Sequence, residues 1–239
     1  MIRAVTFDFW NTIARARHEG AMRDARARAV GAALAAEDLE VETAAVVAAL
    51  EEVGAHWERS WGEGVHLHPR DGAAMLVREL GVEGAAEELV AEAFLTGGRE
   101  VELELAPEIG AVLAELAGRG VRLGIVCDVG FAGGEELRGF LDREGLLQHF
   151  SGWAFSDEVG HYKPDPRIFE AALDALGASP GEALHVGDLR RTDVAGGAAL
   201  GMGTVRYRGV HDDPDPAGGI EADLVIDRHT ELLAAVVSS

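Results

Sequence analysis

The order of apolar and polar positions divides the chain into regions with different periodicities. Residues 2–8 form a short apolar run, which predicts a buried strand. From about residue 15 to residue 103, apolar residues recur at helical spacing, as in 27–34. Glycine, proline and polar residues interrupt this pattern at 62–72, which predicts a loop between helices.

Beyond residue 104, helical and strand patterns alternate. We predict helices at 107–116, 135–144, 166–176 and 194–200, and strands at 121–127, 153–155, 183–186, 204–205 and 224–226. This alternation predicts right-handed crossovers and a mostly parallel sheet. We therefore expect an α/β fold, with a Rossmann-like core of residues 1–14 and 104–239 and an inserted helical domain of residues 15–103. Residues 210–219, rich in Asp, Pro and Gly, are expected to form an exposed loop.

Composition narrows the class of protein. With 48% hydrophobic and 26% charged residues, the chain of 239 residues is typical of a soluble globular protein. Its apolar runs are far shorter than the roughly 20 residues that span a bilayer. The single cysteine excludes an internal disulfide, and we expect a cytoplasmic protein. A net charge of −21 argues against nucleic acid or an anionic membrane as a partner.

Ligands of parallel α/β sheets bind outside the carboxyl ends of the strands, so residues after each strand are candidates for chemistry. These candidates are Asp8, Cys127-Asp128, Lys163, and Asp188 with Asp193. Three carboxylates and a lysine that converge at one sheet edge suit a magnesium ion and an anionic substrate. Lysine adds a compact positive charge to such a group.

The motifs at these strand ends resemble those of the haloacid dehalogenase-like hydrolase superfamily. The residues that carry the resemblance are Asp8-Phe9-Trp10-Asn11-Thr12, Cys127, Lys163-Pro164-Asp165, and Gly187-Asp188 with Asp193. Their order and spacing fit the superfamily over essentially the whole chain. The helical insertion looks like that superfamily's cap domain.

The resemblance implies a role for each motif. Asp8 attacks phosphorus and forms an aspartyl-phosphate, which water then hydrolyses. Asp8, Asp188 and the backbone carbonyl of Trp10 bind Mg²⁺, and Asp193 is a further ligand or an anchor for the ligands. Lys163 bridges Asp8 and the phosphate.

Trp10 departs from the pattern, because the superfamily's phosphatases usually carry an acid–base Asp there. Such help is worth about 10²–10⁴-fold, and indole has no acid that titrates near neutral pH. Either the leaving groups need no acid, or His18 or a cap histidine supplies the proton, or turnover is slow or absent. The superfamily's dehalogenases also lack this acid and commonly carry Tyr there, so a 2-haloacid dehalogenase remains an alternative. The intact Gly187-Asp188 and Asp193 favour metal-dependent phosphoryl transfer.

Two further departures from the superfamily's pattern occur at Cys127 and Asp128. Cys127 occupies a position usually held by Ser or Thr, which implies a weaker donor to a phosphoryl oxygen. The alternative is that Cys127 is a small buried hydrophobic residue with no role in binding. Asp128, where many relatives carry Asn, would repel a phosphate, and we favour a capping role for it at the 130–134 turn.

Six residues are candidates for substrate binding: Asn11, Thr12, Asp128, His66, His68 and Arg70. Those from the insertion flank a glycine-containing loop and are candidates as a group, although packing or solvation is the favoured explanation for each one singly. We predict a magnesium-dependent phosphatase, monomer or homodimer, that acts on a small phosphorylated metabolite. The alternatives are a dehalogenase, or a catalytically weakened protein that binds a phosphorylated ligand.

Overall fold

The computed structural model describes residues 1–18, 20–214 and 219–237. The chain divides into two units. The first unit consists of Met1–Arg15, Glu104–Asp128 and Arg138–Ser239, and the second of Ala16–Leu103 and Val129–Leu137. The predicted domain boundaries differ in counting 129–137 with the core, and they stay a prediction.

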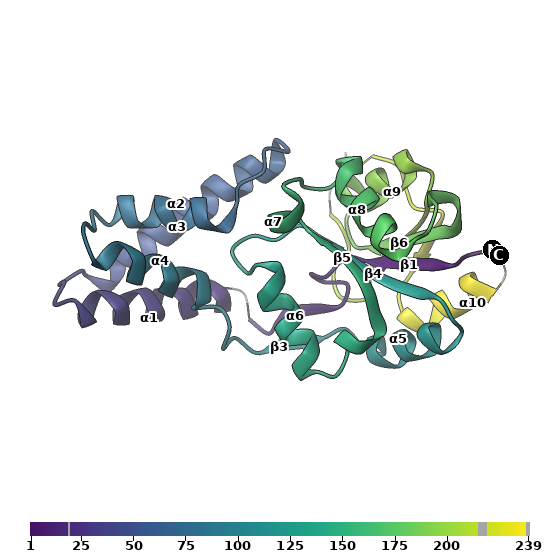
Figure 1. Cartoon of the computed structure of the whole chain (residues 1–239), viewed down its shortest axis with the longest axis horizontal. Coiled ribbons are helices and arrows are strands. Elements are labelled where there is room, and N and C mark those ends of the chain that lie inside the picture. Colours follow the sequence, from purple (N-terminus) through teal and green to yellow (C-terminus); the bar gives the residue numbers. More distant parts are fainter. Residues whose placement is uncertain (19, 215–218, 238–239) are drawn as a thin grey trace. The chain divides into compact units, whose positions relative to one another are not determined.

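The first unit is built on a six-stranded sheet with the order β5-β4-β1-β6-β7-β8 (Figure 1). Its strands are β1 Ala4–Phe7, β4 Arg122–Cys127, β5 Phe150–Phe155, β6 Ala183–Gly187, β7 Gly203–Tyr207 and β8 Leu224–Ile226. Every adjacent pair is parallel, and all four residues of β1 are buried, as expected for a sheet covered on both faces. The predicted α/β class is confirmed.

Helices cover both faces of this sheet, with α8 and α9 on one side and α5 and α10 on the other (Figure 1). The helices outside the inserted region are α5 Ile109–Gly118, α6 Gly134–Arg143, α7 Ser156–Val159, α8 Pro166–Leu176, α9 Ala195–Leu200 and α10 Leu232–Val237. Helix α8 has the predicted bounds because its end signals are local. The Asp165 side chain accepts a hydrogen bond from the Arg167 backbone, Pro166 occupies the first turn, and Gly177 ends the helix in the left-handed region.

Other predicted bounds shift by several residues. Strand β5 begins three residues before the predicted 153–155, and a π-helical turn at Arg190–Val194 precedes α9. A small two-stranded sheet of β2 (Ala14–Ala16) and β3 (Leu103–Leu105) was not predicted, because three residues are too few to show a strand period. Part of the predicted loop at 210–219, residues 215–218, lies outside the described residues.

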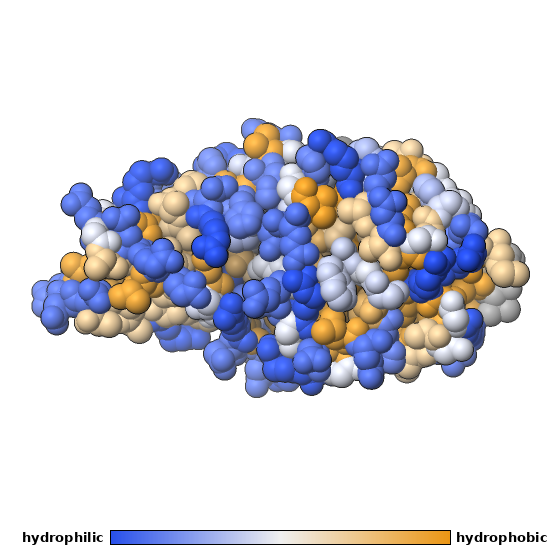
Figure 2. Space-filling model, viewed as in Figure 1, coloured by the Kyte–Doolittle hydropathy of each residue, from blue (hydrophilic) through white to orange (hydrophobic). Residues whose placement is uncertain are grey.

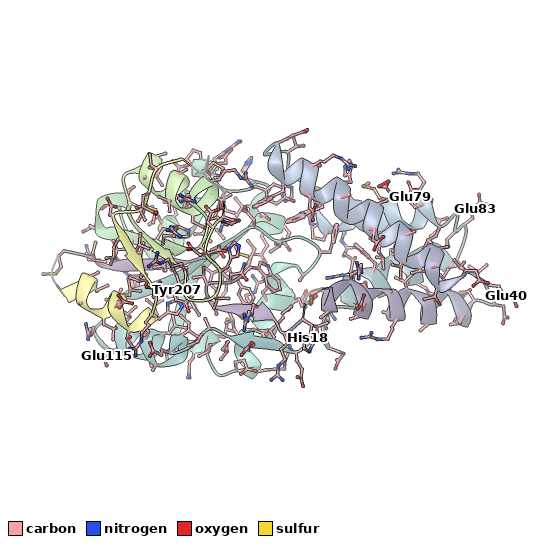
Figure 3. All side chains as sticks on the ribbon, turned by 180° about the vertical axis from the view of Figure 1, so that it is seen from behind. His18, Glu40, Glu79, Glu83, Glu115 and Tyr207 are labelled. Atoms are coloured by element: carbon pink, nitrogen blue, oxygen red, sulfur yellow. The ribbon has the colours of Figure 1, made fainter. Side chains whose placement is uncertain are left out.

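The second unit contains four helices among its described residues, as the helical periodicity predicts. They are α1 Ala21–Ala36, α2 Thr43–Gly62, α3 Pro69–Glu79 and α4 Ala86–Thr96. Their buried faces form one hydrophobic cluster that includes Val30, Leu34, Val53, Leu76, Val90 and Phe94. The loop expected at 62–72 is shorter, because Pro69 begins α3. Glu40, Glu79 and Glu83 project from one end of this unit (Figure 3).

Figure 2 shows hydrophilic residues over most of the visible face, with hydrophobic residues in small groups between them. Such scattered apolar exposure is ordinary for a folded protein. Among the described residues, no helix has the length and apolar character needed to cross a membrane.

Candidate active site

The carboxyl ends of four neighbouring strands, β5, β4, β1 and β6, bring the predicted motifs together. Strand β1 lies between β4 and β6, and Phe7 is level with Ile125 on one side and Val186 on the other. The chain order reverses direction across the sheet at β1, which is where ligands of such sheets bind. Asp8 follows directly, and its backbone N–H donates to Val186 O at 2.8 Å.

A buried ion-pair triad occupies this edge. Lys163 Nζ donates to Asp8 Oδ1 at 2.6 Å and to Asp193 Oδ1 at 2.7 Å. The exposed fractions are 5% for Asp8, 3% for Lys163 and 1% for Asp193. Because 155 positions separate Lys163 from Asp8, only the fold joins them. The triad places a cation beside the carboxylate that we expect to react.

The pKa values of the triad follow from burial and charge. Burial raises the pKa of Asp8 well above its usual value, and the Lys163 ammonium opposes this shift without cancelling it. Burial alone would lower the pKa of Lys163, but Asp193 and Asp8 together raise it well above its usual value. For Asp193, Lys163 and His185 outweigh burial and hold the pKa below its usual range. Lys163 and Asp193 are therefore both charged at neutral pH.

The close approach of Asp193 explains the glycine in Gly187-Asp188. A β-carbon on Gly187 would overlap Asp193 Cγ, so only glycine leaves room for that carboxylate. Asp193 Oδ1 accepts from Lys163 and faces His185 Nε2 at 3.0 Å, and its Oδ2 accepts from the Leu189 backbone N–H at 3.0 Å. Both of its oxygens are thus held by protein donors.

Asp188 has different partners. Its Oδ2 accepts from Asn11 Nδ2 at 3.3 Å and lies 2.9 Å from His211 Nδ1. Asn11 has a φ of 58°, a left-handed conformation that asparagine tolerates. Burial raises the pKa of Asp188, with His211 opposing, and the hydrogen bond to Asp188 raises the pKa of His211.

Sequence reasoning missed His211. It lies in an Asp-rich segment after β7, which has no periodicity of its own. Asp213 anchors this segment by accepting from the Arg190 backbone N–H at 3.0 Å and from Arg190 Nε at 3.2 Å. The aspartates that follow His211 were the available sequence signal for a site residue here. Aspartate favours turns, and a turn close to the end of β7 can hold a histidine near the sheet edge.

The remaining residues of the first motif differ in burial. Trp10 is half-buried, packs edge-on against Phe9 with ring centroids 5.1 Å apart, and forms a backbone bridge with Ala14. Thr12 is fully buried, and its Oγ1 has no hydrogen-bond partner among the residues that the structure describes. Its carbonyl lies 2.8 Å from His229 Nε2. These contacts make Thr12 a link to the C-terminal region.

Cys127 and Asp128 end β4 beside the triad. Burial, followed by the Asp8 charge, raises the pKa of the Cys127 thiol well above its usual value, so the thiol is neutral. Its Sγ lies 3.5 Å from Asp128 O. Asp128 Oδ1 accepts from the Lys163 backbone N–H at 2.8 Å. Asp128 therefore connects the end of β4 to the segment that contains Lys163, a role that the sequence did not indicate.

The candidates from the insertion belong to the other unit. His68 caps α3, because its Nδ1 accepts from the Arg70 backbone N–H at 3.1 Å. His66 and His68 meet edge to face with ring centroids 6.4 Å apart, and Arg70 is exposed. His18, considered above as a proton donor, is also exposed (Figure 3). The substrate-binding role of these residues stays a prediction.

The carboxylates at the sheet edge fit a divalent cation by donor chemistry. Asp8, Asp188 and Asp193 contribute three carboxylates against the single Lys163 ammonium, and hard oxygen ligands are those that Mg²⁺ prefers. Among the described residues, no three His, Cys, Asp or Glu side chains already form a metal-binding group. Asp193 is held by donors, so Asp8 and Asp188 have the oxygens best suited to a metal.

These features define an α/β protein with a buried aspartate–lysine centre at the carboxyl edge of a parallel sheet. Residues 2–201 match the family described as haloacid dehalogenase-like hydrolase. The chain belongs to this family and is a hydrolase.

Phosphatases stand among the similar proteins. A glyceraldehyde 3-phosphate phosphatase of Methanopyrus kandleri is 35% identical over 173 residues, 71% of this chain and 72% of that protein. A phosphoserine phosphatase of Thermus thermophilus is 41% identical over 138 residues, 56% of this chain and 53% of that protein. The second match therefore spans about half of its relative.

Solved structures share the fold. A 2-haloacid dehalogenase of Pseudomonas syringae has a TM-score of 0.70 at 24% identity, covering 100% of this chain and 99% of that one. A HAD phosphatase of Thermococcus onnurineus has a TM-score of 0.63 at 24% identity, covering 98% of both chains. At these identities, the likeness concerns the fold alone.

Proposed function

We propose that this chain is a magnesium-dependent phosphatase that acts on a small phosphorylated metabolite. The observation that carries the proposal is the contact of Lys163 Nζ with both Asp8 and Asp193, next to the Asp188 carboxylate. This arrangement supplies a nucleophile, a fixed positive charge and spare carboxylate oxygens for a metal. The similarity to two named phosphatases supports the same assignment.

In the proposed reaction, an Asp8 oxygen attacks phosphorus and the bond from phosphorus to the leaving oxygen breaks. Water then attacks phosphorus, which releases inorganic phosphate and restores the Asp8 carboxylate. Lys163 holds Asp8 in place and balances negative charge on the transferred group. Asp8, Asp188 and the Trp10 carbonyl are the proposed Mg²⁺ ligands, and Asp193 serves as the anchor of Lys163. When bound, Mg²⁺ offsets repulsion between the carboxylate and the phosphoryl oxygens.

Several finer assignments belong to the same proposal. Residues 15–103 are proposed to be a cap that selects the substrate, with His66, His68 and Arg70 as the residues that read it. Cys127, Asn11 and Thr12 are proposed to line the phosphate site, whereas the Asp128 carboxylate, which would repel phosphate, is held by the Lys163 backbone N–H. We also propose a cytoplasmic location, because the single cysteine suits a reducing compartment.

A dehalogenase is the second candidate, and Trp10 is the observation that favours it. Trp10 places an aromatic ring where a phosphatase usually has its acid. A similar protein, an (S)-2-haloacid dehalogenase of a Pseudomonas strain, is 31% identical over 110 residues, which span 47% of it. In this reading Asp8 attacks carbon and displaces a halide.

One set of assays separates the candidates. The purified chain is incubated with acetyl phosphate, p-nitrophenyl phosphate and 2-chloropropionate, each with Mg²⁺ and with a chelator. We expect phosphate release that requires Mg²⁺. Chloride release that survives the chelator would overturn the phosphatase proposal. Bound Mg²⁺ without turnover of any substrate would indicate a phospho-ligand-binding protein instead.

A further inference from the structure

A chain of buried hydrogen bonds leads from the interior of the sheet to Asp8. Thr6 on β1 and His185 on β6 are register partners, and Thr6 Oγ1 lies 2.8 Å from His185 Nδ1. The opposite ring nitrogen, Nε2, lies 3.0 Å from Asp193 Oδ1. Thr6 and His185 are 0% and 1% exposed. The same Asp193 oxygen accepts from Lys163, which contacts Asp8.

The partners of His185 determine which ring nitrogen carries the proton. An ionised Asp193 can only accept, so Nε2 must be the protonated nitrogen and must donate. Nδ1 then accepts from the Thr6 hydroxyl, whose other contact, to Leu184 O, is longer at 3.4 Å. A neutral ring with this single tautomer satisfies both nitrogens in a fully buried position.

We propose that His185 is a positioning residue, whose Nε2–H fixes the Asp193 carboxylate so that Asp193 holds the Lys163 ammonium against Asp8. The inference rests on the proposed function only in taking Asp8 as the nucleophile. It applies equally to attack at phosphorus or at carbon, because Lys163 contacts Asp8 in either case.

The geometry shows how His185 affects the position of Lys163 through the Asp193 carboxylate that both residues contact. Asp193 Oδ1 is shared between Lys163 and His185, while Oδ2 accepts from the Leu189 backbone N–H at 3.0 Å and from Thr192 Oγ1 at 3.4 Å. Without the imidazole donor, Oδ1 keeps only the Lys163 ammonium, so the carboxylate loses one of the two donors that fix the position of this oxygen. Displacing a reacting group by about 1 Å can cost up to about 10²-fold in rate.

A matched pair of variants separates positioning from packing. The His185 ring packs edge-on against Phe169 with centroids 5.0 Å apart, and His185→Asn and His185→Gln both lose that contact. The Gln amide reaches roughly as far as Nε2 and can still donate to Asp193, whereas Asn is too short. We expect similar losses of melting temperature in both variants. We also expect His185→Asn to lower kcat about tenfold or more with little change in KM, and His185→Gln to recover most of it.

A second measurement needs neither turnover nor metal. In protein labelled with ¹⁵N in histidine and lysine, NMR should show His185 with Nε2 protonated and Nδ1 unprotonated. It should also show a Lys163 ammonium signal protected from solvent exchange, retained in His185→Gln and lost in His185→Asn. A protonated Nδ1, or equal Lys163 signals in both variants, would overturn the proposal. So would equal kcat in the two variants.

The two hypotheses fail in different ways. If the wild-type chain hydrolyses no phosphate substrate with Mg²⁺, the proposed function fails while the Lys163 signal still decides the role of His185. If it releases chloride instead, the comparison of Asn and Gln variants is made on that reaction. If it turns over phosphate but the variants behave alike, only the role of His185 fails.

Discussion

Asp8, the proposed nucleophile, lies next to a buried positive charge. Lys163 Nζ lies 2.6 Å from its Oδ1, and burial raises its pKa well above the usual value. A carboxylate in this setting is poorly hydrated and depends on nearby positive charge to stay ionised. The reactivity that we propose for Asp8 therefore depends on its contact with Lys163 as well as on its own carboxylate.

Asp8→Asn tests this role. The amide keeps an oxygen for Lys163 but cannot form an acyl phosphate, so we expect turnover to fall at least about 10³-fold. Initial rates with Mg²⁺ and acetyl phosphate measure the loss, and urea denaturation of the same variant checks that it folds. Activity within tenfold of wild type would show that another residue is the nucleophile.

Trp10→Asp tests the missing acid at the neighbouring position. A carboxylic acid there should assist departure of poor leaving groups, and such assistance is worth about 10²–10⁴-fold. We expect a larger gain on glycerol phosphate than on acetyl phosphate, whose leaving group needs no proton. Trp10→Phe is the control, because it keeps a ring next to Phe9 without adding an acid. Equal or lower rates on both substrates in a folded Trp10→Asp protein would contradict this account.

At the scale of elements, the sequence best predicts those helices and strands whose first and last residues have local capping or terminating side chains. Helix α8 has its cap at Asp165 and its stop at Gly177, and the sequence alone predicted its bounds. Strand β6 ends at Gly187, and a tertiary contact explains why this residue is a glycine. The Asp193 carboxylate occupies the space that a β-carbon on Gly187 would need. The sequence indicated the Gly187-Asp188 motif but not this contact.

Gly187→Ala should disturb both stability and activity. The added methyl overlaps the Asp193 carboxylate, and overpacking of this kind costs about 1–3 kcal/mol. We expect a lower urea midpoint and, because Asp193 holds Lys163, a lower kcat. Gly181→Ala is the control, since nothing lies within 4 Å of a β-carbon there. A Gly187→Ala protein that matches this control in both measurements would refute the packing argument.

At the scale of the whole molecule, contacts between residues far apart in the sequence hold the C-terminal part of the first unit against its N-terminal part. His229, 217 positions from Thr12, has its Nε2 2.8 Å from the Thr12 carbonyl and stacks on Tyr207 with centroids 3.9 Å apart. Its Nδ1 is buried with no hydrogen-bond partner among the described residues. Burial lowers the pKa of His229 to about 4, because the charged imidazolium loses its hydration there, and the hydrogen bond to the Thr12 carbonyl opposes this shift only in part.

This shift predicts a pH dependence of folding stability. Below about pH 6.5 the unfolded chain binds a proton at His229 that the folded chain refuses until about pH 4. Stability from this group is therefore complete above pH 6.5 and is lost as the pH falls through that window, by about 3 kcal/mol in all.

Urea unfolding of wild type and His229→Gln between pH 7.5 and about pH 4 measures the effect. Glutamine keeps a donor for the Thr12 carbonyl and does not titrate. The free-energy difference between the two proteins should shrink as the pH falls. A difference that is constant with pH would contradict the shifted pKa of His229.

The sequence by itself determined the fold class, the helical insertion and the identity of the residues that meet at the sheet edge. Strand and helix periodicity, local caps and the order of motifs are short-range properties, so Asp8, Lys163 and Asp188 could be found without coordinates. Only the tertiary structure showed that Asp193 is held by protein donors, that His185 lies behind it, and that His211 contacts Asp188. Those contacts join residues on different elements of the fold. Periodicity and motif spacing are local properties of the sequence, so they do not specify which side chain packs beside the buried Asp188 or Asp193 carboxylate.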